Sequence, residues 1–178
     1  MGREIRRVPP HWQHPRDERG HLQPMYDRQF AGAAKEWKDE FAKWEAGERP
    51  SYCSADDAKL EAWEWIGKPP DRKYYRPFAD EEATWYQLWE TVTEGTPVSP
   101  PFATLEELVA HLAKFGDDWD RKRGDGGWGL AAATRFVKTG WAPTLMILTN
   151  KDGERVFMEA KDIPLACNST PTPEKETA

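Results

Sequence analysis

Three histidines near the N-terminus are the first residues whose types and spacing suggest chemistry. His11, His14 and His21 lie within eleven residues, with Asp17 and Glu18 between them. Imidazole and carboxylate groups are suitable ligands for a first-row metal ion. However, no two of these histidines are four residues apart, and neighbouring prolines make the backbone irregular. We therefore expect no metal ion, and a metal-using histidine site remains the alternative.

A glycine-rich segment, residues 124–129, precedes a predicted helix. Its glycines stand at the first, third and sixth positions, as in a dinucleotide-binding turn. That turn requires a strand before it, whereas residues 117–123 are a charged run that is not typical of a strand. We therefore predict a flexible loop and no cofactor. An anion or partner site using Arg121, Lys122 and Arg123 is the alternative.

Nucleophilic catalysis has little support in the sequence. There is no Gly-x-Ser-x-Gly turn, and neither Cys53 nor Cys167 has a histidine close to it in the sequence. We predict no catalytic residue. An enzyme would be a small hydrolase that uses the N-terminal histidines or the carboxylates of residues 117–125.

Arginine and large aromatic residues in irregular segments favour protein binding, because Trp, Tyr and Arg dominate contact energies at interfaces. Several tryptophans lie in loops or off the apolar face of a predicted helix: Trp12, Trp65, Trp119, Trp128 and Trp141. The predicted partner-binding residues are Arg6, Arg7, Trp12, Tyr74, Tyr75, Arg121, Arg123 and Trp128. We expect this surface to join the N-terminal segment to residues 119–128 and to meet an acidic partner surface. The alternative is that Trp12 and Trp128 close the ends of the core.

The composition limits the class of protein. The chain has 178 residues, 25 Lys and Arg against 31 Asp and Glu, and ten tryptophans. Its length suits one domain, and its net charge of −6 disfavours a general nucleic-acid binder. No apolar run reaches the roughly 18 residues that span a membrane, and the N-terminus lacks the apolar segment of a signal peptide. We expect a cytoplasmic protein with free thiols and no membrane partner.

Three regions are predicted along the chain. Residues 1–25 form an irregular basic arm, with five arginines against three acidic residues. Residues 26–167 form a single α+β domain, and residues 168–178 form a disordered tail.

The apolar spacing predicts a mainly helical chain of about five helices. The clearest is residues 28–46, where Phe30, Ala34, Trp37, Phe41 and Trp44 make one apolar stripe. Thr104 and Glu107 form a capping box at the start of another. The predicted helices are residues 28–46, 55–66, 81–93, 105–115 and 130–139.

The C-terminal part predicts β-structure. Residues 144–149 and 154–159 read as the strands of an antiparallel hairpin around a turn that ends in Gly153. A lone hairpin is marginal, so we expect it to gain a third strand, for which residues 4–8 are the candidate. The predicted fold class is therefore α+β, mainly helical, with a C-terminal hairpin joined by an N-terminal strand.

Several stretches resemble a group of uncharacterised proteins encoded by tailed phages and prophages. These are Arg3-Glu-Ile-Arg-Arg-Val-Pro-Pro-His-Trp12, His14-Pro-Arg-Asp17, Gly95-Thr-Pro-Val-Ser-Pro, Phe102-Ala-Thr-Leu-Glu-Glu-Leu and Gly140-Trp-Ala-Pro143. The resemblance covers about half the chain, and these 31 residues are its distinctive part. The resemblance implies a phage origin, and with it the cytoplasm of a host cell, but it assigns no activity and no site.

These observations favour a phage accessory protein that acts by binding a host or phage protein, as an inhibitor or adaptor of a host factor or defence system. A minor virion structural or assembly protein is one alternative, and the small hydrolase is the other. The oligomeric state stays open at this stage.

Overall fold

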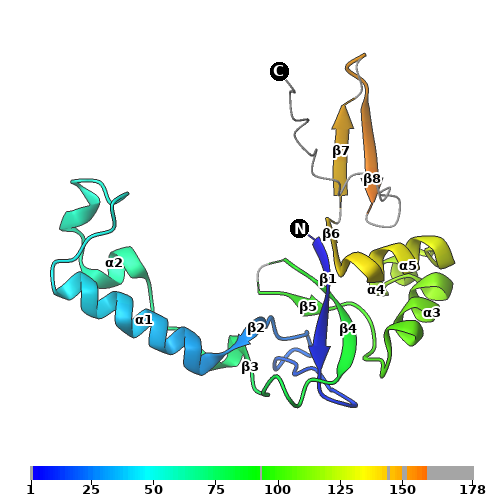
Figure 1. The fold of residues 1–178 in the computed structure, drawn as a ribbon, viewed down its shortest axis with the longest axis horizontal. Coiled ribbons are helices and arrows are strands. Elements are labelled where there is room, and N and C mark those ends of the chain that lie inside the picture. The colour runs from blue at the N-terminus through cyan, green and yellow to red at the C-terminus, as the bar shows by residue number, and fades with distance from the viewer. Residues whose placement is uncertain (1, 93, 144, 150–151, 160–178) are drawn as a thin grey trace, which may run out of the picture.

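A four-stranded antiparallel sheet lies at the centre of the fold, with strand order β5-β4-β1-β6 (Figure 1). The computed structural model describes residues 2–92, 94–143, 145–149 and 152–159. The four strands are β1 (Gly2–Val8), β4 (Trp85–Glu90), β5 (Thr96–Pro97) and β6 (Trp141–Pro143).

The pairing of β1 with β4 gives the sheet two buried faces. The register runs from Arg3 opposite Glu90 to Val8 opposite Trp85. One face carries Leu88, which packs with residues of α3 (Leu105–Phe115) and α5 (Leu130–Thr139). The opposite face carries Val8 and Trp89, which pack against Met25, Phe78 and Ala83. Residues that alternate along β1 and β4 therefore enter two separate apolar clusters.

The predicted mainly helical fold class is wrong, because a four-stranded antiparallel sheet forms the centre of the structure. Residues 81–93, predicted as a helix, contain strand β4 instead. The apolar residues Trp85, Leu88 and Trp89 fit a helical stripe, but they also fit a strand that is buried on both faces. Pairing with β1 decides between the two. The N-terminal strand accordingly pairs with β4 and β6, and not with the C-terminal strands.

The strands β7 (Leu145–Thr149) and β8 (Arg155–Glu159) pair antiparallel in a separate two-stranded sheet. In Figure 1 this pair projects from the body of the molecule. The turn of the predicted hairpin includes residues 150–151, which lie outside the described residues. The predicted tail, residues 168–178, also lies outside them.

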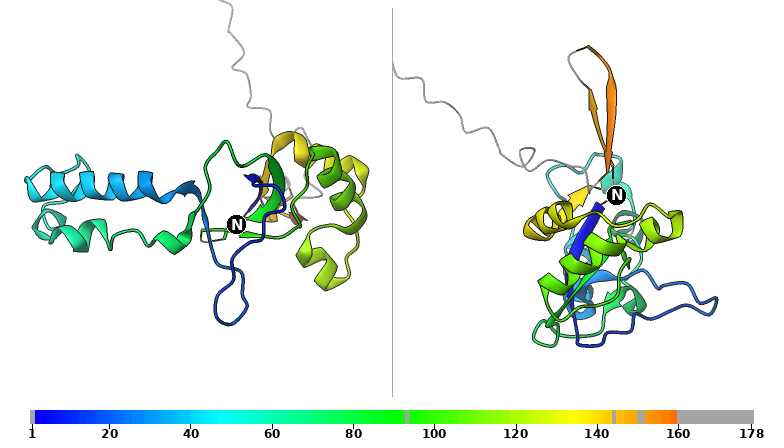
Figure 2. Two further views of the ribbon diagram at one scale, coloured as in Figure 1. Left: turned by 90° about the horizontal axis from the view of Figure 1, so that it is seen from below. Right: turned by 90° about the vertical axis from the view of Figure 1, so that its right-hand side faces the viewer.

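Residues 30–70 form a helical projection that extends away from the sheet (Figures 1 and 2). It contains α1 (Phe30–Glu45), a 3-10 turn η1 (Asp57–Lys59) and α2 (Ala62–Ile66). Its two ends meet the sheet region where β2 (Tyr26–Gln29) pairs parallel with β3 (Tyr75–Arg76), beside the short turn η2 (Arg72–Tyr74). We call this junction the neck.

The helices of the projection differ in part from their prediction. Helix α1 matches the predicted range 28–46 closely, although its N-cap is Gln29. The helix predicted over 55–66 is divided, because Leu60 and Glu61 have extended backbone angles. Glu61 then begins α2 with a capping box to Glu64, so the chain turns back along α1.

Candidate functional site

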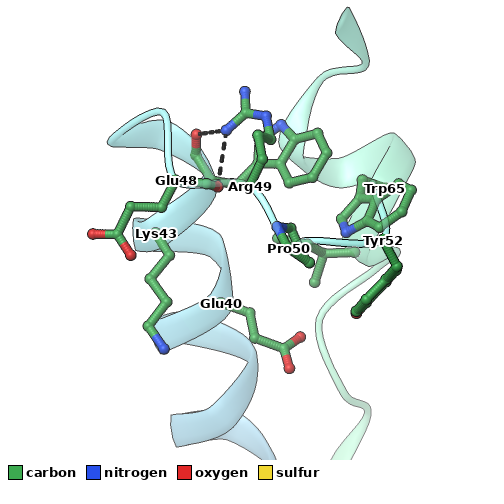
Figure 3. Close-up of a pocket in the computed structure, with 9 residues that line it drawn as sticks. Glu40, Lys43, Glu48, Arg49, Pro50, Tyr52 and Trp65 are labelled. Atoms are coloured by element: carbon green, nitrogen blue, oxygen red, sulfur yellow. Dashed lines mark hydrogen bonds between the residues drawn. The ribbon is translucent and has the colours of Figure 1, made fainter. Parts of the chain in front are cut away.

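A pocket of about 360 Å³ lies between α1 and α2 at the far end of the helical projection (Figure 3). We call it the projection pocket. Its lining combines aromatic rings with charged side chains: Glu40, Lys43, Trp44, Glu48, Arg49, Pro50, Tyr52, Trp65 and Ile66.

Two tryptophans of α1 hold the returning chain in place to form this pocket. The Nε1 group of Trp37 donates to the carbonyl oxygen of Gly67 over 3.1 Å, and that of Trp44 donates to Leu60 over 3.0 Å. These indoles are seven residues apart, which places them on one side of the helix, two turns from each other. The same apolar stripe that predicts the helix therefore also fixes the segment around α2.

The aromatic wall of the pocket is a series of stacked rings. The ring centres of Trp44 and Trp65 are 5.1 Å apart and their planes differ by 18°. Tyr52 stacks on Trp65 at 6.2 Å. Trp44 is buried, whereas Tyr52 is 79% exposed. The wall thus has a fixed inner ring and an outer ring that is available to a ligand.

The charged groups around this wall are not equivalent. The guanidinium carbon of Arg49 lies 3.9 Å from the centre of the Trp44 ring, and its NH1 group donates to the carbonyl oxygens of Trp44 and Glu48. Figure 3 shows the Glu40 side chain extending toward Tyr52, while Lys43 extends the other way. Among the residues that the structure describes, Glu40 makes no hydrogen bond or ion pair. Lys43 and Glu48 also form no ion pair among the described residues, but Glu40 is the unpaired charged group that extends toward the aromatic wall.

A second pocket, of about 480 Å³, lies at the neck. It shares Glu40 and Ile66 with the projection pocket and reaches Tyr74 and Tyr75. One of its four acidic residues, Glu36, forms an ion pair with Arg28 over 2.6 Å. The two pockets thus follow one side of α1 from the neck to the far end of the projection.

A third pocket, of about 660 Å³, lies where residues 13–16 cross the sheet. His14 in its lining donates from Nε2 to the carbonyl oxygen of Gln23 over 2.6 Å. Burial lowers the pKa of His14, and the nearby positive charges of Arg16 and Arg6 lower this pKa further. Its Nδ1 is buried and has no hydrogen-bond partner among the described residues. The His14 ring also meets the Trp89 ring of β4 edge-on, with ring centres 4.9 Å apart, so His14 is a neutral side chain that holds this segment against the sheet.

The three N-terminal histidines do not converge on one site. His11 packs against the Trp85 ring with centres 4.5 Å apart, and His21 pairs with Asp17. Within residues 2–92, 94–143, 145–149 and 152–159, no three His, Cys, Asp or Glu side chains are grouped as metal ligands would be.

The predicted partner-binding residues of the N-terminal half have different environments. Arg6 is buried, pairs with Glu4, donates to the carbonyl oxygen of Met25 and lies over the Trp89 ring at 4.4 Å. Arg7 is exposed on β1. Arg6 therefore stabilises the fold and is not a surface residue, which corrects its predicted role.

The aromatic members of the predicted surface are also part of the fold. Trp12 is half-buried against Phe78, with ring centres 4.9 Å apart. Tyr75 is buried at the neck, where its ring contacts Tyr26, and Tyr74 is half-buried beside it. Only Tyr74 and Tyr75 in the predicted set line a pocket that continues toward the projection.

Residues 117–123 are more ordered than predicted. Helix α4 (Asp118–Arg123) occupies most of them, and the buried carboxylate of Asp117 accepts hydrogen bonds from the backbone of Trp119 and Asp120. Asp117 also accepts a hydrogen bond from Arg3 of β1 over 2.7 Å. The local signal for α4 is the capping box of Asp117 and Asp120, which sequence reasoning missed, whereas the contact with Arg3 joins residues that are distant in the sequence.

The two arginines of α4 are neutralised by neighbouring acids, whereas the Nζ group of Lys122 lies over the Trp119 ring. Arg121 pairs with Asp118, and Arg123 pairs with Asp120 and Asp125. Trp128 is half-buried, donates from Nε1 to Asp120 and meets the Phe136 ring edge-on. The eight predicted residues are therefore not gathered on one exposed basic surface.

Sequence reasoning did not find the central residues of the projection pocket. Trp65 lies off the apolar stripe of its predicted helix, which is the only local signal that it faces something else. Tyr52 and Glu40 carry no such signal. Tyr52 stacks on Trp65 and comes near Glu40 only through the course of residues 47–61.

No helix among the described residues is both long and apolar enough to cross a membrane. No protein-family model, curated protein or solved structure matches the chain, so no relative assigns a role to the projection pocket.

Proposed function

We propose that this protein acts by binding another protein, and that the helical projection is the part that docks. The observation that carries this proposal is the pocket with an exposed aromatic wall at the far end of the helical projection, which does not pack on the sheet. Neither apolar cluster that packs on the sheet contains a residue of the projection.

Two exposed rings supply the expected contact energy. Tyr52 is 79% exposed and Trp63, on the neighbouring helix α2, is 62% exposed. Covering both rings would remove roughly 250 Å² of apolar surface from water, worth about 6 kcal/mol before the entropic cost of association. Rings of this type are the residues that most often dominate a protein interface.

The biological setting is proposed from the resemblance to phage and prophage proteins. In that setting the protein is an accessory protein that binds a host or phage protein as an inhibitor or adaptor. The pocket supports the binding mode, and the resemblance supports the setting, so the two parts of the proposal rest on separate observations.

Quantitative capture from a host-cell lysate tests the binding mode. The full chain is compared with the double variant Tyr52→Ala/Trp63→Ala and with the matched control Phe115→Ala/Trp141→Ala. The control removes two exposed aromatic residues outside the projection. We expect a captured protein whose recovery falls about tenfold or more with the first variant and is unchanged with the second. Equal recovery of every protein with both variants, or no enriched protein, would contradict the proposal.

A further inference from the structure

The projection pocket places one unpaired carboxylate beside two stacked aromatic rings. We propose that it binds the cationic side chain of a lysine or arginine that the partner presents on an extended segment. This inference rests on the proposed function, and it names the chemistry of the partner.

The pocket lining has two acids and two bases, and it is the orientation of Glu40 toward the aromatic wall that supports a cation. A lysine or arginine side chain is favoured where an aromatic face and a carboxylate are both within reach, because the ring face carries partial negative charge. Arg49 already covers the Trp44 ring and donates to backbone carbonyl oxygens. Tyr52 remains exposed, and Glu40 has no partner among the described residues.

The shape of the projection supports an extended segment. The projection pocket and the neck pocket share Glu40 and Ile66, and both are lined by residues three or four apart on α1. From Ala33 to Trp44 this band is about 16 Å long, the length of about five residues of extended chain. Pro69 and Pro70 lie at the neck end of the same groove. A partner strand along it would place one side chain over Glu40.

This assignment reverses the charge that the sequence predicts for the partner. The expected acidic partner surface depends on four arginines, at residues 6, 7, 121 and 123. The structure pairs three of them with an acid of the same chain and leaves Arg7 exposed on β1. A basic side chain is the complement of the group that remains unpaired at the aromatic wall.

The probe is the pentapeptide acetyl-Ala-Ala-Lys-Ala-Ala-amide, added to the full chain and followed through the indole N–H signals in NMR. A Trp65→Phe variant assigns the signal of Trp65. We expect the lysine peptide, and its arginine counterpart, to shift this signal. The neutral norleucine counterpart should bind about tenfold more weakly or worse, because it keeps the chain length and loses the charge.

Two charge-matched variants locate the effect. Glu40→Gln should weaken the lysine peptide by about fivefold to tenfold. Glu45→Gln removes the same charge from the same helix outside the pocket lining, and it should change nothing. Unchanged dispersion of the other indole signals shows that both variants fold.

The inference is overturned if norleucine and lysine peptides bind equally, if Glu40→Gln binds as the parent does, or if no shift occurs at millimolar peptide. It is also overturned if an oligothymidylate shifts Trp65 while the lysine peptide does not, because a nucleic acid would then be the occupant.

Failure here can be separated from failure of the proposed function. If the captured protein is lost with Tyr52→Ala/Trp63→Ala but kept with Glu40→Gln, docking stands and cation recognition is overturned. If the lysine peptide binds through Glu40 and no protein is captured, cation recognition by the pocket holds and the proposed function is contradicted.

Discussion

Trp44 of α1 and Trp65 of α2 stack with their ring centres 5.1 Å apart, and this contact joins the two sides of the helical projection. The projection has few buried residues: Ala33, Trp44 and Ala62 are its buried apolar residues among those described. The shape of the pocket therefore depends strongly on a single buried indole.

Replacing that indole should loosen the projection without unfolding the sheet. Trp44→Ala should lower the local stability of residues 30–70 by about 3 to 5 kcal/mol, because it removes a large buried ring. Trp44→Phe keeps a ring and loses the hydrogen bond to Leu60, so it should cost about 0.5 to 1.5 kcal/mol. Hydrogen exchange resolved along the chain measures both effects. Equal protection of residues 30–70 in the parent chain and Trp44→Ala would contradict this account.

The buried pair of Arg3 and Asp117 should contribute strongly to global stability. Asp117→Ala removes the closer of the two carboxylates that pair with Arg3, at 2.7 Å against 3.6 Å for Glu90, and it removes the cap of α4. We expect a loss of about 3 kcal/mol in denaturant unfolding. The control is Asp125→Ala, which removes an exposed ion pair and should cost at most about 1 kcal/mol. Similar losses of unfolding free energy for the two variants would show that the buried pair contributes no more to stability than the exposed pair does.

Two glycines should respond in opposite directions to the same substitution. A Cβ at Gly127 would collide with the backbone of Ala113 and Lys114 at the end of α3, so Gly127→Ala should cost about 1 to 3 kcal/mol. A Cβ at Gly32, inside α1, meets no atom within 4 Å. Gly32→Ala should therefore stabilise the protein by about 0.5 to 1 kcal/mol. Thermal unfolding measures both, and destabilisation by Gly32→Ala would refute the open position assigned to it.

The buried histidine should make stability depend on pH. Burial lowers the pKa of His14 in the folded protein, while in the unfolded chain this pKa is about 6.5. Below about pH 6.5 the unfolded chain therefore binds more protons than the folded protein does. The contribution of His14 to the free energy of unfolding is therefore complete above about pH 6.5, and it is lost as the pH falls toward the lower pKa of His14 in the folded protein.

Unfolding measured from pH 7.5 to pH 5.5 tests this direction with His14→Gln as the comparison. The free energy of unfolding of the parent chain should fall more steeply toward low pH than that of His14→Gln. His111 contributes in the same direction in both proteins, because burial also lowers its pKa. Parallel curves for the two proteins would mean that His14 titrates alike in the folded and unfolded states.

Local signals in the sequence predicted several helices well. The capping box of Thr104 and Glu107 begins α3 as expected, because both halves of that motif lie within four residues. The stripe that ends at Trp44 predicted α1 for the same reason. Interactions of this range are visible in the order of residues alone.

The sheet and the projection pocket depend on contacts between distant residues. Trp85, Leu88 and Trp89 form a strand because β1 is available to pair with them, and the carboxylate of Asp117 is buried against Arg3, which is distant in the sequence. Arginine is a residue type that is common at interfaces, but Arg6 lies on the inner strand β1 and is buried in the fold. Tyr52 stacks on Trp65 only because residues 47–61 bring the chain back along α1.

The most direct test of the account locates the partner on the surface of the full chain. A photo-crosslinking phenylalanine analogue is placed at Tyr52 in one protein and at Trp119, an exposed residue of α4, in another. We predict that the captured partner crosslinks at position 52 and not at position 119, and that Glu40→Gln reduces the crosslink while Glu45→Gln leaves it unchanged. A partner that crosslinks at position 119 and not at position 52 would contradict the account, because it would place the interface on α4 instead of the helical projection.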